Sequence, residues 1–192
     1  MQEKTMKVVG IGLFTAIVVV LQAMAIAIRF GVFNITLVLV PIVVGAALFG
    51  WAAGAWLGFV FGLVVLFTDA GAFLAISVPG TIITCIAKGM LAGMAAGLVH
   101  KALEKKNKLV AAIGAGLIAP VVNTGVFLLG CCIFFLDTLK EWGAAAGFSS
   151  VGSYMLVGFV GMNFVVELII NLALATVIVR LIGLGRKMIA TK

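Results

Sequence analysis

Apolar residues run along this chain in long blocks that short polar stretches separate. Several blocks approach or exceed the roughly 20 apolar residues that cross a bilayer as an α-helix, and they lack the alternation of membrane β-strands. The pattern predicts an all-α membrane protein, a single domain of residues 1–192 with six transmembrane helices. The second expected span is short and carries Pro41, and the sixth is long enough to require a strong tilt. The expected spans are residues 7–28, 35–49, 51–67, 78–99, 109–135 and 153–182.

The composition supports a membrane protein. The 192 residues are 65% hydrophobic and only 10% charged, with a mean hydropathy of +1.37. No soluble domain of this length has such a composition. The first apolar block follows Lys4 and Lys7, as it would in a signal peptide, but it is long enough to span the bilayer. We therefore expect it to be retained as the first helix.

The basic residues gather on one predicted side of the membrane. That side holds the N-terminus, the loop HKALEKKNK at residues 100–108 and the C-terminal segment from Arg180, whereas the other side holds only Arg29 and Lys140. Because cytoplasmic loops carry the excess of Lys and Arg, this distribution places both termini in the cytoplasm, in agreement with six spans. The net charge of +7 therefore reflects how the chain is oriented in the membrane, and no nucleic-acid partner is expected.

Glycine recurs at every fourth position in the third and fourth predicted spans. Four-residue spacing places each row on one helix face, where two backbones can approach closely. For the fourth span we expect packing within the molecule. The first span has a weaker version of the pattern, Gly12 with Ala16, for which a partner surface is an alternative. The two full rows are Gly54, Gly58 and Gly62, and Gly89, Gly93 and Gly97.

A few strongly polar side chains are predicted deep inside the membrane, at similar depth on three helices. They are Lys88, Asn123, Asn163, Glu167 and Asn171. The last three lie within an arc of about 80° on one helix, because each four-residue step advances only about 40°. Lys88 and Glu167 carry opposite charges, so we expect them to pair, directly or through a ligand or water. The cluster is either a structural ion pair with amide neighbours or a small-molecule site, and the second interpretation is favoured because apolar residues would pack at lower cost.

No grouping of residues indicates catalysis. The chain has no GxSxG, HExxH or Walker motif, and its single histidine lies in the predicted cytoplasmic loop. Three cysteines without a CxxC pair indicate apolar packing rather than metal binding. We therefore expect no enzyme activity, no cofactor and no metal. If the protein supports uphill transport, the ATPase must be another chain.

Several stretches of the sequence resemble one known family over essentially the whole chain. They are FNITLVLVPIVVGAALFGWAAGAWLGFVFG at residues 33–62, KGMLAGMAAGLV from Lys88, APVVNTGVF from Ala119 and NFVVELIINLAL from Asn163. With the size and the six-span layout, they resemble the S component of an energy-coupling factor (ECF) vitamin transporter. The alanine pair of the family's first helix is represented here by Gly12 and Ala16.

This resemblance implies a function. An S component binds a vitamin from outside in a pocket between the outer halves of its fourth to sixth helices, under outer loops. It docks on a membrane coupling protein that two cytoplasmic ATPases drive. The stretches around Phe33 and Asn163 are most similar to pantothenate-type members; cobalamin, folate and a pyrimidine are alternative substrates, and a stand-alone secondary carrier or membrane scaffold is an alternative of another class. Gly12 and Ala16 are the candidate docking residues. The candidate substrate-binding residues are Lys88, Asn123, Asn163, Glu167, Trp142 and Asn34.

Overall fold

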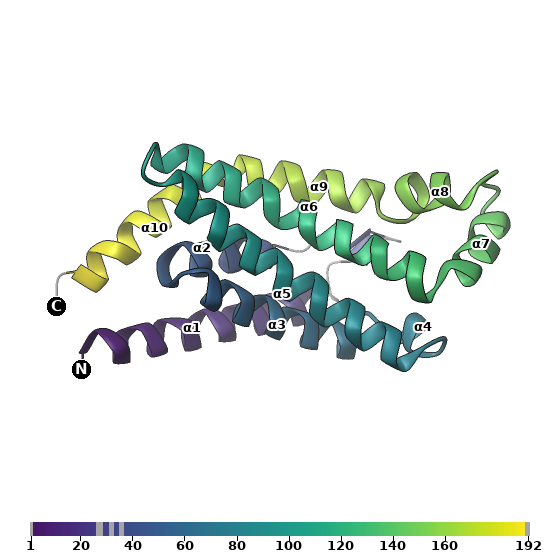
Figure 1. The fold of residues 1–192 in the computed structure, drawn as a ribbon, viewed down its shortest axis with the longest axis horizontal. Coiled ribbons are helices and arrows are strands. Elements are labelled where there is room, and N and C mark those ends of the chain that lie inside the picture. Colours follow the sequence, from purple (N-terminus) through teal and green to yellow (C-terminus); the bar gives the residue numbers. More distant parts are fainter. Residues whose placement is uncertain (1, 26–28, 31–32, 35–36, 191–192) are drawn as a thin grey trace.

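A computed structural model describes the chain except for residues 1, 26–28, 31–32, 35–36 and 191–192. For residues 2–3, 29–30, 33–34, 162 and 186–190 it describes the backbone alone. The described chain is helical apart from one antiparallel pair of two-residue strands (Figure 1). The elements are α1 (Gln2–Ala25), β1 (Arg29–Phe30), β2 (Phe33–Asn34), α2 (Leu39–Phe49), α3 (Trp51–Thr68), α4 (Gly71–Leu74), α5 (Val78–Leu103), α6 (Lys108–Phe134), α7 (Leu136–Ala145), α8 (Val151–Ser153), the π-helix η1 (Tyr154–Phe159), α9 (Gly161–Ala173) and α10 (Ala175–Ala190).

Local sequence signals set the starts of the two longest helices. The hydroxyl of Ser77 accepts a hydrogen bond from the Gly80 amide, and a proline stands in the first turn of α5. The side-chain oxygen of Asn107 accepts hydrogen bonds from the Leu109 and Val110 amides at the start of α6. These caps satisfy amides that have no partner within the helix, which fixes where α5 and α6 begin.

Four helices of the described chain are long and apolar enough to cross a membrane, and a fifth span results if the bent helix pair Val151–Phe159 and Asn163–Ala173 counts as one. The prediction of several membrane spans agrees with these helices, whereas the number six stays a prediction. The second predicted span differs most, because α2 has only 11 residues. At 1.5 Å per residue it covers about 16 Å, roughly half of a hydrocarbon core.

The sixth predicted span is not the single tilted helix that its length suggested. It is divided into α8, η1, α9 and α10, and its first two parts meet the third at an angle of 43°. A π-helical turn and a glycine are common causes of such a bend, and Gly161 stands where an added Cβ would overlap the carbonyl oxygen of Leu156. The apolar composition alone does not reveal this break.

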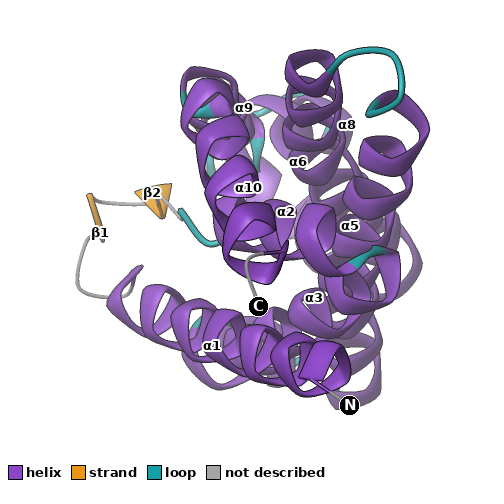
Figure 2. Ribbon diagram, turned by 90° about the vertical axis from the view of Figure 1, so that its left-hand side faces the viewer, coloured by secondary structure: helices purple, strands orange, loops and turns teal. Residues whose placement is uncertain are grey.

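The centre of the bundle is α5, which packs against α3 on one side and α6 on the other. The two predicted glycine rows meet at the α3–α5 contact: a Cβ at Gly58 would overlap the carbonyl oxygen of Gly89, and one at Gly54 would overlap that of Gly93. The expectation of internal packing for the fourth span is confirmed. Figure 2 shows α1 along the lower edge of the bundle, and β1 and β2 at the left, above the level of α1.

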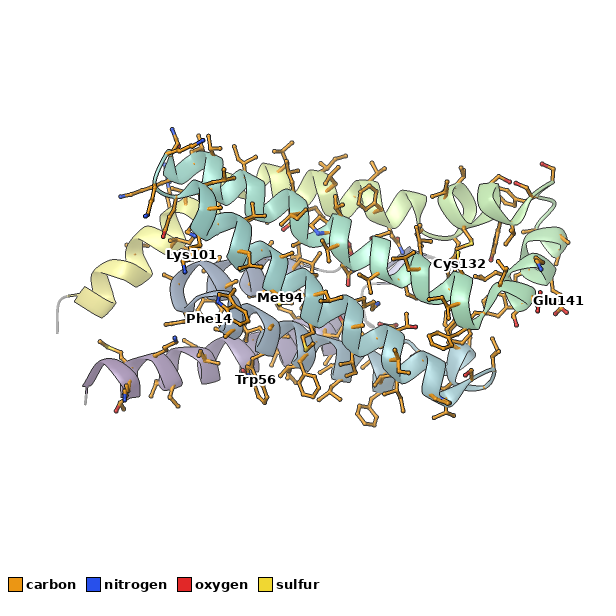
Figure 3. The ribbon with its side chains drawn as sticks, viewed as in Figure 1. Phe14, Trp56, Met94, Lys101, Cys132 and Glu141 are labelled. Carbon is orange, nitrogen blue, oxygen red and sulfur yellow. The ribbon has the colours of Figure 1, made fainter. Side chains whose placement is uncertain are left out.

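The molecule has two chemically different ends. Both termini lie at one end, together with the turn between α5 and α6, and α4 and α7 lie at the other (Figure 1). Figure 3 shows Lys101 near the first end and Glu141 near the second. The basic residues of the predicted cytoplasmic loop, residues 100–108, therefore share an end with the two termini.

Candidate functional site

A cavity of about 600 Å³ opens among α1, α3, α4, α5, α6, α7, η1 and α9. Its volume falls within the range of about 300–1,000 Å³ that is typical of small-molecule sites. The cavity involves α4 and α7, so it lies toward the end of the molecule opposite the two termini (Figure 1). Two connections contribute side chains to its wall, residues 68–77 and 136–152, which the predicted six-span layout places on the outer side.

Five of the six predicted substrate-binding residues line this one cavity: Lys88, Asn123, Trp142, Asn163 and Glu167. The sixth, Asn34, belongs to β2, but its side chain lies outside the described residues. Three separate helices, α5, α6 and α9, therefore bring their deep polar groups to a common space.

Aromatic rings surround the ammonium group of Lys88. Its Nζ lies 4.9 Å from the ring centroid of Phe127 on α6 and 5.8 Å from that of Phe61 on α3. Both distances are within the range of a cation–π interaction. Among the described residues no ion pair joins Lys88 to Glu167. The direct form of the predicted pairing is thus not observed, and pairing through a ligand or water stays a prediction.

Asn123 and Glu167 are more deeply buried than Lys88. Asn123 is 8% exposed, and its Oδ1 has no hydrogen-bond partner among the described residues. Glu167 is 9% exposed, and its backbone carbonyl accepts a 2.9 Å hydrogen bond from Nδ2 of Asn171. Asn171 does not line the cavity. Of the two asparagines that flank Glu167 at helical spacing, only Asn163 faces the site.

An aromatic wall lines the cavity beside the connections at residues 68–77 and 136–152. Phe73 on α4 lies edge-on to Trp142 on α7 and to Phe127 on α6, with ring centroids 5.7 and 5.9 Å apart. Phe159 of η1 packs beside Phe127 and stacks on Tyr154. Among the described residues, five phenylalanines, one tryptophan and one tyrosine line the cavity. These phenylalanines look like ordinary apolar residues in the sequence, because their convergence depends on five different elements.

The break in the last predicted span also belongs to this site. Tyr154, Gly158 and Phe159 of η1 line the cavity, as does Val160, which follows it. Irregular backbone at membrane depth is tolerated only where it is buried in protein or lines a cavity. Interrupted helices form substrate sites in secondary transporters.

Among the lining residues that the sequence analysis missed, Gln22 and Asp69 form a polar pair. Gln22 on α1 is 1% exposed, and its Nε2 donates a 2.9 Å hydrogen bond to Oδ2 of Asp69 at the end of α3. A glutamine near the end of an apolar block was a usable signal for a polar contact inside the molecule. From the sequence, Asp69 was expected to lie in a loop, because the sequence does not show that the end of α3 contacts α1.

The predicted docking residues lie away from the cavity. Gly12 and Ala16 are exposed on α1, and an added Cβ at Gly12 would meet no atom within 4 Å. Their neighbours Val8, Val9 and Leu13 are 60–70% exposed. This face of α1 is free of internal packing, so its contact in the membrane is either lipid or another protein.

The chemistry of the site is that of binding. Within the described residues, no three His, Cys, Asp or Glu side chains gather closely enough to hold a metal ion. The cavity combines one ammonium group, buried amides, two carboxyl groups and aromatic rings. Such a lining replaces the water around a small polar ligand while the rings exclude bulk solvent.

Two comparisons with known proteins bear on this site. The family model for the substrate-specific component of ECF transporters matches residues 6–180. The pantothenic acid transporter PanT of Lactococcus lactis subsp. cremoris (strain MG1363) is 29% identical over 199 residues, covering 93% of this chain and 94% of that protein. No solved structure matches the chain. The matched family is a family of transport components, not of enzymes.

Proposed function

Since this chain belongs to the family of substrate-specific components of ECF transporters, we propose that it captures pantothenate from outside the cell and delivers it through an energy-coupling module. The observation that carries the proposal is the convergence of Lys88, Asn123, Asn163 and Glu167 on one cavity of about 600 Å³. The name of the Lactococcus relative points to the same vitamin.

The functional groups of pantothenate fit the groups of the cavity. Its carboxylate is an anion, and Lys88 is the one cation among the described residues of the lining. Its amide and hydroxyls can bond to Asn123 and Asn163, and its two methyl groups can pack on the aromatic wall. Glu167 braces the floor of the site from α9. We expect Trp142 on α7, and Asn34 on the connection after α1, to close over the bound vitamin.

Other vitamins fit less well or differ in charge. Cobalamin is much larger than a cavity of this size can enclose, and folate is longer than pantothenate. A pyrimidine fits by size but offers no carboxylate to Lys88. The described lining of the cavity is rich in aromatic rings, which would also suit a flavin or thiamine. Both compounds therefore belong in the test panel.

We place the cavity on the outer side of the membrane and both termini in the cytoplasm, with six spans. The support is the gathering of basic residues and both termini at the end opposite α4 and α7 (Figures 1 and 3). Cytoplasmic segments of membrane proteins carry the excess of Lys and Arg. In this orientation the vitamin enters from outside, beneath the two outer connections.

The decisive experiment is titration of the purified protein in detergent with each vitamin. Isothermal titration calorimetry should give nanomolar-range binding of pantothenate without ATP, and no comparable binding of folate, cobalamin, a pyrimidine, riboflavin or thiamine. Binding of another vitamin in place of pantothenate would correct the substrate. Failure of every vitamin to bind would refute the proposed function.

The partners are a membrane coupling protein and two cytoplasmic ATPases, with the exposed face of α1 at Gly12 and Ala16 as the docking surface. Small residues let two helices approach closely in a membrane, so a large side chain there should separate them. Gly12→Leu and Ala16→Leu should leave pantothenate binding unchanged and stop uptake by whole cells. Loss of both binding and uptake would instead place these residues in internal packing.

A second experiment distinguishes an ECF component from a secondary carrier or scaffold. The ATPases should co-purify with the wild type and be lost from the Gly12 and Ala16 variants.

A further inference from the structure

The cation of the cavity is held in an unusual way for a buried lysine. A half-buried ammonium group in an apolar helix bundle is normally neutralised by a carboxylate. Lys88 has no ion-pair partner within 4.0 Å among the described residues, although Asp69 and Glu167 line the same cavity. Its nearest described stabilising groups are the ring faces of Phe127 and Phe61.

We propose that Phe61 and Phe127 are positioning residues that hold the Lys88 ammonium group as a receptor for the anionic end of the substrate. The inference rests on the proposed function and adds which end of the ligand lies where. A phenylalanine ring attracts a cation through its quadrupole but does not neutralise the charge or occupy the donors. The three N–H groups of Lys88 therefore remain available to a carboxylate of the ligand, which a salt bridge would have prevented.

The two rings come from opposite neighbours of α5, which fixes the lysine from both sides. Phe61 on α3 is 3% exposed and belongs to the core beneath α1 and α3. Phe127 on α6 is held in turn by its ring contacts with Phe73 and Phe159. The ammonium group is thus placed by packed side chains rather than by a flexible partner, and its long stem loses less entropy on binding.

This arrangement predicts the orientation of the ligand. The carboxylate lies against Lys88 between α3, α5 and α6. Asn123 stands four residues before Phe127, on the same face of α6, so it is placed to bond the amide next along the ligand. The hydroxyl end then faces the remaining polar wall. A cationic vitamin would place like charge against Lys88, so the site selects for anions.

The test compares pantothenate with pantothenol, its neutral alcohol analogue, by calorimetry on the same purified proteins. The wild type should bind pantothenate at least about tenfold more tightly than pantothenol, the scale of a charge-assisted hydrogen bond. Lys88→Met should bring this ratio close to one. Phe127→Leu and Phe61→Leu should each lower the ratio about three- to tenfold, the range expected of a partly desolvated cation–π contact.

Matched variants separate positioning from simple packing. Phe164→Leu removes a ring of the same cavity wall that has no described contact with Lys88, Phe61 or Phe127, so it should weaken both ligands alike and keep the ratio. Phe127→Tyr keeps the ring face and should restore the ratio. If Phe127→Leu and Phe164→Leu behave alike, the positioning role is wrong. If the wild type binds both ligands equally, Lys88 does not bind the carboxylate of the ligand and this inference is wrong, whereas the proposed function is unaffected. If pantothenate does not bind at all, the proposed function fails and this inference fails with it.

Discussion

Two parts of the surface of α5 pack in opposite ways. Toward α3 it presents Gly89 and Gly93, and the two backbones approach so closely that no Cβ fits between them. Lys88, the residue before Gly89, instead lines a cavity of about 600 Å³, where its ammonium group lies between the rings of Phe61 on α3 and Phe127 on α6. One helix thus takes part both in a close backbone contact without intervening side chains and in the lining of a cavity. The close contact with α3 fixes the position of α5, and therefore the position of the polar side chain that α5 contributes to the cavity.

The largest effect is expected where the close contact is broken. Gly58→Leu would force a side chain into the backbone of α5 at Gly89, where even a methyl group overlaps. We expect the free energy of unfolding to fall by at least about 3 kcal/mol, as for severe overpacking. Thermal unfolding in detergent measures this loss. Gly12→Leu is the control, because Gly12 has no neighbouring atom within 4 Å, and a similar loss there would show a general intolerance of larger residues.

The next effect concerns the two charges that share the cavity. Lys88→Met and Glu167→Gln should have additive effects on the thermal midpoint of the ligand-free protein, because no ion pair is described between them. Their effects on pantothenate binding should be non-additive by about 1 kcal/mol, because the ligand joins the two sites. A double-mutant cycle by calorimetry measures this coupling. Coupling in the ligand-free protein instead would indicate a structural pair.

A smaller effect should separate two asparagines of the same helix. Asn163 lines the cavity, whereas Asn171 is buried outside it and bonds to the backbone of α9. Asn163→Leu should weaken pantothenate binding by at least about 1 kcal/mol, the scale of an unmade hydrogen bond. Asn171→Leu should change the thermal midpoint and leave the dissociation constant unaltered. Equal effects on binding would show that the deep polar cluster acts as one structural unit.

The smallest effect is expected at the exposed surface of α7. Lys140 donates a 2.8 Å hydrogen bond to Asp137, which lowers the pKa of that carboxyl. Because the folded pKa is lowered, the stabilisation is present above the carboxyl's unfolded pKa and is lost as pH falls through the lowered value. The pair is exposed, so solvent screens it. Asp137→Asn should slightly reduce the thermal midpoint at pH 7, leave it unchanged at pH 2, and not affect pantothenate binding; a large shift would mean that α7 depends on this pair.

Regular features of this protein could be predicted because their physical causes are local. The apolar blocks reveal α1, α3, α5 and α6, since a bilayer demands about 20 consecutive apolar residues. The glycine rows indicate a close helix contact, since four-residue spacing puts them on one face. The deep polar residues Lys88, Asn123, Asn163 and Glu167 point to a shared site, because polar groups in a membrane are costly and must meet other polar groups or water.

Other features depended on contacts between distant parts of the chain. The break of the last predicted span at η1 leaves composition unchanged, so hydropathy does not detect it. Phe61, Phe73 and Phe127 are indistinguishable from lipid-facing residues until three elements bring them around one cavity. Gln22 and Asp69 meet only because the end of α1 lies against the end of α3. The sequence alone determined that this protein lies in a membrane and which polar groups it keeps there, because each residue meets the bilayer individually. Tertiary structure decided which side chains face the same space, because that depends on how helices pack.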